Sequence, residues 1–334
     1  MPEDQKFNRA LGALLGGALG DAMGMPTQLL SPAEINRNYG FVDGFVAPSA
    51  DHPVSQGLSA GQITDDTEQT LLLSSVLLGS RNGFNHHAWV KALIGWEEEI
   101  KARGGYDLLG PSTKRAIDAI NNGAPPEEAG RHGDTNGAAM RIAPVGIMVP
   151  PAANLLERVA ETCRATHNTS IAISAAAAVA TVISHGIDGA DWHVALSFAV
   201  DAARQAESQG HWVAGGSVAA RIAWALDLVE DCSLEEGINR VFDRVGTSVA
   251  SQESVPAAFA VLKLVKGDAW QAAVIAANLG GDTDTIGAIA GSMAGACAGY
   301  ESLPKDRIEQ LVGIDLEKTR RQARALVEAR AAHG

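Results

Sequence analysis

This 334-residue chain has few cysteines, few aromatic side chains and fewer basic than acidic residues. The cysteines, Cys163, Cys232 and Cys297, are isolated and form no CxxC pair, so we expect free thiols rather than a disulfide framework or a thiolate zinc site. With 26 basic against 39 acidic residues, the formal net charge is -13, which disfavours polyanionic partners. We therefore expect no nucleic-acid partner and no membrane partner.

The sequence also lacks a recognisable targeting or membrane-spanning segment. Residues 1–9 are polar and show neither the charged nor the apolar region of a signal peptide. The most apolar run, residues 171–183, is rich in alanine, is interrupted by Ser174 and Thr181, and is too short to span a bilayer. These features predict a buried core helix in a cytoplasmic protein.

Strand signals are missing as well, because no stretch alternates polar and apolar residues between hairpin turns. The 46% hydrophobic content is enough for a large core, and there is no internal repeat or low-complexity linker. We expect an all-α fold: one compact, orthogonal helical domain spanning residues 1–334, with a dozen or more helices and its polar loops on one side. The longest polar stretch, residues 40–62, predicts a loop or lid beside the active site.

Helical periodicity and end signals predict the individual helices. Residues 31–34 (SPAE) form a capping box with proline at the first helical position, which opens a short helix. The other expected helices span residues 7–23, 64–78 (capped by Thr64), 85–103, 112–122, 136–148, 154–165, 168–185, 190–208, 214–229, 234–243, 253–266, 268–278, 284–299, 304–312 and 315–332.

Two acidic tracts, residues 63–67 (ITDDT) and 281–285 (GDTDT), each stand where a polar loop becomes an apolar helix. Each tract by itself is explained by helix capping. Together they supply four carboxylates and several hydroxyls, a hard oxygen-donor set that suits Mg²⁺ or Mn²⁺ rather than zinc or copper. Four adjacent carboxylates repel each other, and two divalent cations would balance their charge. The tracts therefore predict a binuclear metal site if they meet in space.

From about residue 8 to about residue 300 the chain resembles the ADP-ribosylglycohydrolase family, which includes the dinitrogenase-reductase-activating glycohydrolases. The two aspartate tracts carry most of this resemblance. The matching segments are residues 16–24 (GGALGDAMG), 64–67 (TDDT), 110–113 (GPST), 136–141 (NGAAMR), 166–167 (TH) and 280–287 (GGDTDTIG).

The resemblance implies an all-α fold with two Mg²⁺ (or Mn²⁺) ions in a central cleft and hydrolysis of an N- or O-glycosidic bond at the anomeric carbon of ribose. The implied metal ligands are Thr64, Asp65, Asp66, Asp282, Asp284 and Thr285, and Asp65 and Asp66 are the implied catalytic residues. The implied substrate-binding residues are Gln28, Gly110, Ser112, Asn136, Gly137, Met140 and His167. Asp21 is expected to support the site without touching the substrate, or to make a plain loop contact.

One position departs from the family pattern. Much of the family has a glutamate where this chain has Gln28, and an amide cannot accept a proton as a general base. Either Asp65 or Asp66 then takes the role of base, or the substrate differs, or activity is reduced. Three functions stay open: hydrolysis of ADP-ribosyl groups on proteins or in ADP-ribose derivatives, hydrolysis of a nucleoside or other small ribosyl compound, and a catalytically silent relative. The lack of a basic tract favours a less charged substrate.

Three weaker signals have ordinary structural alternatives. Residues 133–137 and 110–113 are glycine-containing loops before helices, which either bind phosphate through backbone N–H groups or are simple capped turns. Trp212 is either a platform for a base or a core residue. Residues 251–254 (SQES) are typical of a capping box, although Glu253 could also face a pocket.

Overall fold

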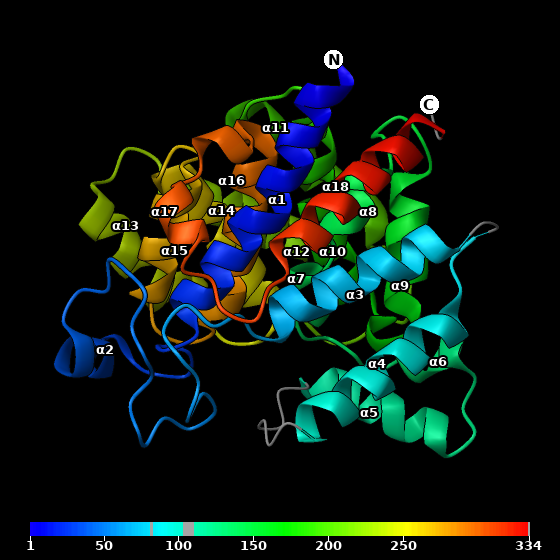
Figure 1. The fold of residues 1–334 in the computed structure, drawn as a ribbon, viewed down its shortest axis with the longest axis horizontal. Helices are drawn as coiled ribbons and strands as arrows, with labels where there is room; N and C mark the ends of the chain where they lie inside the picture. Colours follow the sequence, from blue (N-terminus) through cyan, green and yellow to red (C-terminus); the bar gives the residue numbers. More distant parts are fainter. Residues whose placement is uncertain (81–82, 103–109, 333–334) are drawn as a thin grey trace.

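Two glycine-rich helices lie side by side at the centre of the computed structural model, which describes residues 1–80, 83–102 and 110–332 (Figure 1). They are α1 (Glu3–Gly24) and α16 (Thr283–Ala298). Their facing glycines recur every fourth residue, so they line one face of each helix. A Cβ on any glycine of α1 in this set would lie 2.0–2.4 Å from a carbonyl oxygen of α16, and the facing pairs are Gly12 with Gly295, Gly16 with Gly291 and Gly20 with Gly287. The helices are therefore antiparallel and in backbone contact.

The other helices surround this central pair (Figure 1). Before α10 they are α2 (Pro32–Tyr39), α3 (Asp65–Gly79), α4 (His86–Ala102), α5 (Pro111–Asn121), α6 (Pro126–Ala129), α7 (Gly137–Met140), α8 (Ala143–Met148) and α9 (Leu155–His167). From α10 on they are α10 (Ser170–Ile187), α11 (Trp192–Ala206), α12 (Val218–Leu228), α13 (Leu234–Arg240), the π-helical turn η1 (Val241–Val245), α14 (Ser251–Leu264), α15 (Ala269–Ala277), the 3₁₀ turn η2 (Tyr300–Ser302), α17 (Lys305–Ile308) and α18 (Leu316–Ala331). Within the described ranges β pairing is limited to isolated bridges, which confirms the all-α prediction there. The single-domain organisation stays a prediction.

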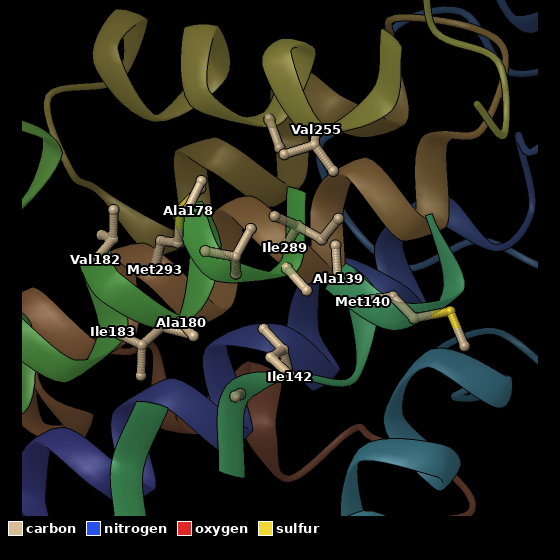
Figure 2. Close-up of a cluster of buried hydrophobic side chains, with 14 of the residues drawn as sticks. Ala139, Met140, Ile142, Ala178, Ala180, Val182, Ile183, Val255, Ile289 and Met293 are labelled. Carbon is tan, nitrogen blue, oxygen red and sulfur yellow. The ribbon is translucent and has the colours of Figure 1, made fainter. Parts of the chain in front are cut away.

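Helix α10 forms the centre of the apolar core. Figure 2 shows Ala178 and Val182 of this helix near Met293 and Ile289 of α16, with Val255 of α14 above them. Among the described residues, α10 is the one helix long and apolar enough to cross a membrane, and 89% of it is buried inside the protein. The prediction of a buried core helix is therefore confirmed.

Several predicted helices end elsewhere for local reasons. The helix expected at residues 136–148 is two, because α7 ends at Met140 and Pro144 occupies the first turn of α8. The helix expected at residues 304–312 ends at Ile308, and the amide of Val312 bonds to the carbonyl of Gly61 instead. Glycines at 215 and 216 delay the start of α12 to Val218. The predicted end of a helix at residue 103 lies outside the described residues.

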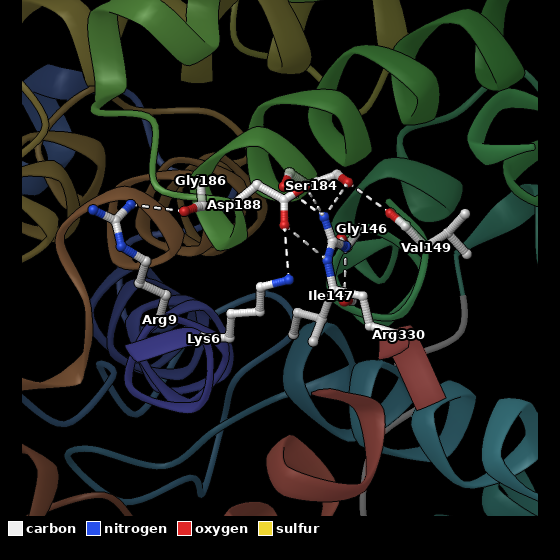
Figure 3. Close-up of polar contacts among 9 residues, drawn as sticks. All are labelled: Lys6, Arg9, Gly146, Ile147, Val149, Ser184, Gly186, Asp188 and Arg330. Atoms are coloured by element: carbon white, nitrogen blue, oxygen red, sulfur yellow. Dashed lines mark hydrogen bonds and ion pairs between the residues drawn. The ribbon is translucent and has the colours of Figure 1, made fainter. Parts of the chain in front are cut away.

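A group of charged side chains, the arginine cluster (Lys6, Arg9, Asp188 and Arg330), fastens both ends of the chain to the end of α10 (Figure 3). Arg330 of α18 is buried and lies 2.8 Å from Asp188. Its guanidinium also donates, at 3.0 Å each, to the carbonyls of Gly146, Ile147 and Ser184. Lys6 of α1 lies 3.3 Å from Asp188, and Arg9 donates to the carbonyl of Gly186 at 2.7 Å. Every charge in this cluster has a partner.

Candidate functional site

Five aspartates meet at the opposite end of α1 and form the acidic cluster: Asp21, Asp65, Asp66, Asp282 and Asp284. Asp65 and Asp66 begin α3, while Asp282 and Asp284 begin α16. Carboxylates are favoured at helix starts, where the backbone N–H groups point outward. The hydroxyl of Thr285 lies 3.4 Å from Asp66 Oδ2, and this contact joins the two tracts across the cluster. The fold therefore brings the two tracts together, as predicted.

Asp21, on the neighbouring helix α1, accepts hydrogen bonds from the first N–H groups of α3. It is fully buried and accepts hydrogen bonds from the backbone N–H of Thr64 at 2.9 Å and of Thr67 at 3.1 Å. The hydroxyl of Thr64 donates to Asp21 at 2.6 Å and makes no cap bond of its own. Thr64 is the N-cap residue of α3, as predicted, but its side chain makes no cap bond, because the carboxylate of Asp21 is a stronger acceptor. Burial raises the pKa of Asp21 to about 6, although these bonds oppose the shift.

Among the described residues, no basic side chain forms an ion pair with an aspartate of the acidic cluster. Burial raises the pKa of Asp65 to about 8, and the charges of Asp21 and Asp282 add to the shift. Burial also raises the pKa of Asp66 and Asp284 well above the ordinary range, with repulsion between the carboxylates as the second cause. In addition, the buried Oδ1 of Asp66 has no hydrogen-bond partner among the described residues. Ionised carboxylates of this kind are unfavourable in a protein interior unless a proton or a cation neutralises them.

The donor atoms fit a hard divalent cation that keeps part of its water. Within the described part of the chain, no three Asp, Glu, His or Cys side chains converge closely enough to form a metal cluster by themselves. Mg²⁺ is usually held by one or two carboxylates with waters and other oxygens. Here the hydroxyls of Thr64 and Thr285 both lie 3.4 Å from Asp66 Oδ2, beside the unpartnered Oδ1. The composition of the site is therefore that of an oxygen-ligand site for magnesium or manganese.

A cavity of about 200 Å³ adjoins the acidic cluster. The residues predicted for the site that line it are Gln28, Asp65, Asp66, Gly110, Asn136, Gly137, Met140, His167, Asp282, Asp284 and Thr285. Asp21, Thr64 and Ser112 are buried behind its wall rather than lining it. Most of the predicted positions are thus gathered around one cavity, and their roles there stay predictions.

Asn136 links the predicted substrate loop to the aspartates. Its Nδ2 donates to Asp282 at 2.5 Å and to the hydroxyl of Ser254 at 2.9 Å. Both donor positions of the amide are therefore used inside the protein. Asn136 fixes the orientation of the Asp282 carboxylate, and only the remaining face of its side chain meets the cavity.

His167 is held as a neutral ring in one tautomer. Burial lowers its pKa well below 6.5, and the charges of Arg141 and Arg115 lower the pKa further. Arg141 has only donors and lies 3.3 Å from Nδ1, so Nδ1 accepts and the proton sits on Nε2. That Nε2–H points to the hydroxyl of Thr135 at 3.2 Å, which in turn donates to Ser112 at 2.9 Å. Ser112 therefore acts on the cavity wall through Thr135.

Gln28 lines the cavity, and its amide nitrogen is bonded to Ser55. The hydroxyl of Ser55 donates to the carbonyl of Met25 at 3.0 Å, so its oxygen accepts the Nε2–H of Gln28, also at 3.0 Å. No described group donates to the Oε1 of Gln28. The predicted loop at residues 40–62 supplies Ser55 for this contact and places Val54 on the cavity wall. Gln28 thus offers an uncharged acceptor beside the acidic cluster.

The cavity wall also includes residues that the sequence did not single out, notably Leu29, Gln69 and Val249. Gln69 follows Asp65 by one helical turn, so the spacing in the sequence places both residues on the same helix face. Leu29 and Val249 belong to loops far apart in sequence, and nothing local marks them. The expected capping box at residues 251–254 is absent: Ser251 lies inside α14, and Glu253 accepts instead from the backbone N–H of Ser248 at 3.1 Å.

A helical fold with aspartate tracts at the starts of α3 and α16 defines a class that comparison with known proteins identifies. Residues 2–334 match the ADP-ribosylglycohydrolase family, and the chain belongs to it. It is 33% identical to the uncharacterized protein YegU of Escherichia coli (strain K12) over 328 residues, which cover 97% of this chain and 98% of YegU. It is 27% identical to the ADP-ribosyl-[dinitrogen reductase] glycohydrolase of Rhodospirillum rubrum over 96% of each chain. A solved structure described as an ADP-ribosylglycohydrolase-related protein complex matches with a TM-score of 0.70 at 25% identity, covering 98% of this chain and 99% of that one.

Proposed function

We propose that this protein is a magnesium- or manganese-dependent hydrolase that cleaves the ribosyl glycosidic bond of an ADP-ribosyl group, carried by a protein side chain or by a small ADP-ribose derivative. The observation that carries the proposal is the acidic cluster beside an open cavity, with raised carboxylate pKa values and an unpartnered oxygen on Asp66. Perturbed carboxylates of this kind gather at functional sites. The names of relatives such as the Rhodospirillum enzyme support the choice of ADP-ribosyl substrates.

The residues of the chain divide the work according to their surroundings. Asp65 is partly exposed and lines the cavity, so it is the carboxylate placed to take a proton from an attacking water. Asp66 and Asp284 are buried and would stabilise the positive charge that develops on the ribose ring as the bond breaks. Gln28 offers an acceptor that orients a hydroxyl or water without taking its proton. The base role therefore lies with an aspartate rather than with position 28.

Two divalent cations would be held by Thr64, Asp65, Asp66, Asp282, Asp284 and Thr285. When bound, they would neutralise the carboxylates and supply positive charge to the ribose hydroxyls. Asn136 fixes Asp282 for this role, and Asp21 fixes the start of α3. The protein would thus contribute the oxygen ligands, and the cations would neutralise their negative charge.

A hydrolysis screen tests the proposal. The purified protein is incubated with ADP-ribosylated arginine, ADP-ribosylated protein, ADP-ribose derivatives and free nucleosides, with Mg²⁺ and with EDTA. We expect release of the ADP-ribosyl group in the presence of Mg²⁺ and none in EDTA. Release of ribose from nucleosides with ADP-ribosyl compounds untouched would replace the proposal with a nucleoside hydrolase. Binding of ADP-ribose without turnover of any compound would identify a silent relative.

A further inference from the structure

One histidine in the loop at residues 40–62 builds the turn that follows it. His52 is 3% exposed, and its Nδ1 accepts hydrogen bonds from the backbone N–H groups of Val54 at 3.2 Å and of Ser55 at 2.8 Å. A ring nitrogen that accepts hydrogen bonds carries no proton, so the ring is neutral and its proton lies on Nε2. His52 therefore acts as Asn or Asp side chains do in turns, where a side-chain acceptor bonds to the backbone just beyond it.

The turn made by His52 leads directly to the cavity. Ser55 is fully buried, and its hydroxyl oxygen accepts the Nε2–H of Gln28 at 3.0 Å while it donates to the carbonyl of Met25, also at 3.0 Å. Val54 and Gln28 both line the cavity. A change in the turn at His52 would therefore move one part of the cavity wall and remove the support of another.

The two ends of this loop are held by contacts of a different kind. The backbone N–H of Val42 donates to the side-chain oxygen of Asn278 at 2.9 Å. The backbone N–H of Ile63 donates to the carbonyl of Val312 at 3.1 Å. Amide and carbonyl groups do not titrate near neutral pH, so these bonds do not depend on the protonation of His52. Opening of the turn can therefore stay local, between two fixed ends.

A protonated His52 is incompatible with the turn. The second proton would sit on Nδ1 and face two N–H groups, so three donors would meet without an acceptor. Burial lowers the pKa of His52 below its ordinary value of 6.5, and the backbone carbonyl of Gln28 and the charge of Asp51 oppose this shift without cancelling it. Within the described part of the chain, Asp51 is the charged group that acts on the ring. Protonation of the ring is therefore coupled to opening of the turn.

We propose that His52 is a positioning residue of the site: its neutral ring folds the turn that carries Ser55 to Gln28, and protonation of the ring opens this turn and releases Gln28. The inference rests on the proposed function, because it concerns the regulation of the same site. The open turn binds the extra proton more readily than the closed turn. The closed turn is therefore fully formed above about pH 6.5 and weakens as the pH falls below that value.

Hydrogen exchange of the full chain, with Mg²⁺ present throughout, tests the proposal at pH 7.5 and pH 5.5. The measured quantity is the protection of the backbone N–H groups in residues 50–58, corrected for the intrinsic effect of pH on exchange. An exposed imidazole titrates near pH 6.5, so we expect protection in the wild-type protein to fall about tenfold at pH 5.5.

Two substitutions at His52 separate the acceptor from the titration. His52→Asn places an oxygen where Nδ1 stands and does not titrate in this range, so protection should be retained at both pH values. His52→Ala has no acceptor, and protection should be low at both. His87→Asn is the matched control, because His87 is an exposed histidine on the distant helix α4, and it should behave as the wild type does.

Three results would overturn the inference: wild-type protection that does not change with pH, the same pH dependence in His52→Asn, or wild-type protection in His52→Ala. If His52→Ala folds poorly, the comparison of wild type with His52→Asn decides. The link to Gln28 is tested by hydrolysis, where His52→Asn should keep about tenfold more of its turnover at pH 5.5 than wild type does, and equal pH profiles would contradict that link. The exchange measurement needs no turnover, so it decides the role of His52 in the turn even if no ribosyl compound is cleaved.

Discussion

The acidic cluster and the arginine cluster lie at the two ends of helix α1, and they differ in how their charges are balanced. In the arginine cluster Arg330 is matched by Asp188 and by backbone carbonyls. In the acidic cluster Asp66 and Asp284 repel each other, and one oxygen of Asp66 has no hydrogen-bond partner among the described residues. Removing one partner of a buried ion pair destabilises a fold, whereas buried carboxylates that repel each other are typical of functional sites.

Helix α1 makes this comparison informative because it belongs to both clusters. Lys6 stands near its start and Asp21 near its end, and the glycine face between them rests on α16. The same helix pair therefore carries a structural anchor at one end and half of the candidate site at the other. Changes to each part should separate loss of function from loss of stability.

The largest expected effect is on turnover. Asp284→Asn removes one carboxylate of the acidic cluster, so we expect hydrolysis to fall by about 100-fold or more while the helical circular dichroism spectrum is retained. The metal-free variant should melt at or above the wild-type temperature, because a repulsive charge is gone. Asp65→Asn should behave in the same way in the hydrolysis assay. Full activity in either variant would refute the assigned role.

A change in the glycine face should disturb both clusters at once. A Cβ at Gly20 would lie 2.0 Å from the carbonyl oxygen of Gly287, so Gly20→Ala must push α1 from α16. We expect a loss of about 2–3 kcal/mol in the free energy of unfolding, measured in urea. Gly95 in α4 has open space at the same atom, and Gly95→Ala should instead stabilise the protein by about 0.5–1 kcal/mol. Equal effects of the two substitutions would contradict the packing described.

Breaking the arginine cluster should reduce stability without directly touching the site. Arg330→Leu leaves Asp188 and several carbonyls without their donor, and we expect about 3 kcal/mol of destabilisation by chemical denaturation. Lys6→Gln removes only the half-exposed partner of Asp188 and should change stability by less than about 1 kcal/mol. Residual folded Arg330→Leu protein should keep its activity per molecule. A loss of activity beyond the loss of folded protein would link the two clusters more closely than we infer.

The last prediction concerns pH: the stability contributions of the two clusters should change in opposite directions as the pH rises. The pKa of Asp65 rises from 3.8 to about 8 in the folded protein, so its favourable contribution is complete below pH 3.8 and is lost as pH rises through about 8. Burial raises the pKa of Asp188, but Arg330 and Lys6 bring it below the ordinary value, so its contribution is present above that value and is lost in acid.

Thermal melting in EDTA should therefore show a decline between pH 5 and pH 8 that Asp65→Asn reduces and that Mg²⁺ reverses. Asp188→Asn should instead flatten the loss of stability at acid pH. A melting temperature in EDTA that rises between pH 5 and pH 8 by the same amount in wild type and in Asp65→Asn would contradict the raised pKa.

The sequence predicted the helices well and their long-range contacts poorly. Local signals such as the capping box at Ser31, which the structure confirms, act within one turn and are readable from the chain. The bonds from α3 to Asp21 join residues more than 40 positions apart, so the sequence did not indicate that Asp21, rather than the Thr64 side chain, accepts them. The four-residue spacing of Gly12, Gly16 and Gly20 is visible in the sequence. It places three glycines on one helix face, where α16 makes its close contact.

The candidate site was predictable to the extent that its chemistry lies in short motifs. The candidate ligands can be read directly from the two aspartate tracts, and the fold brings these tracts together. The opposite wall of the cavity depends on how separate loops pack, and Val249 carries no local mark of its position.

A crystal of the protein grown with Mn²⁺, measured at a wavelength that reveals manganese by anomalous scattering, tests the central claim most directly. The account predicts two manganese peaks between the aspartates at the start of α3 and those at the start of α16. Manganese bound elsewhere, with that space filled only by water, would contradict it.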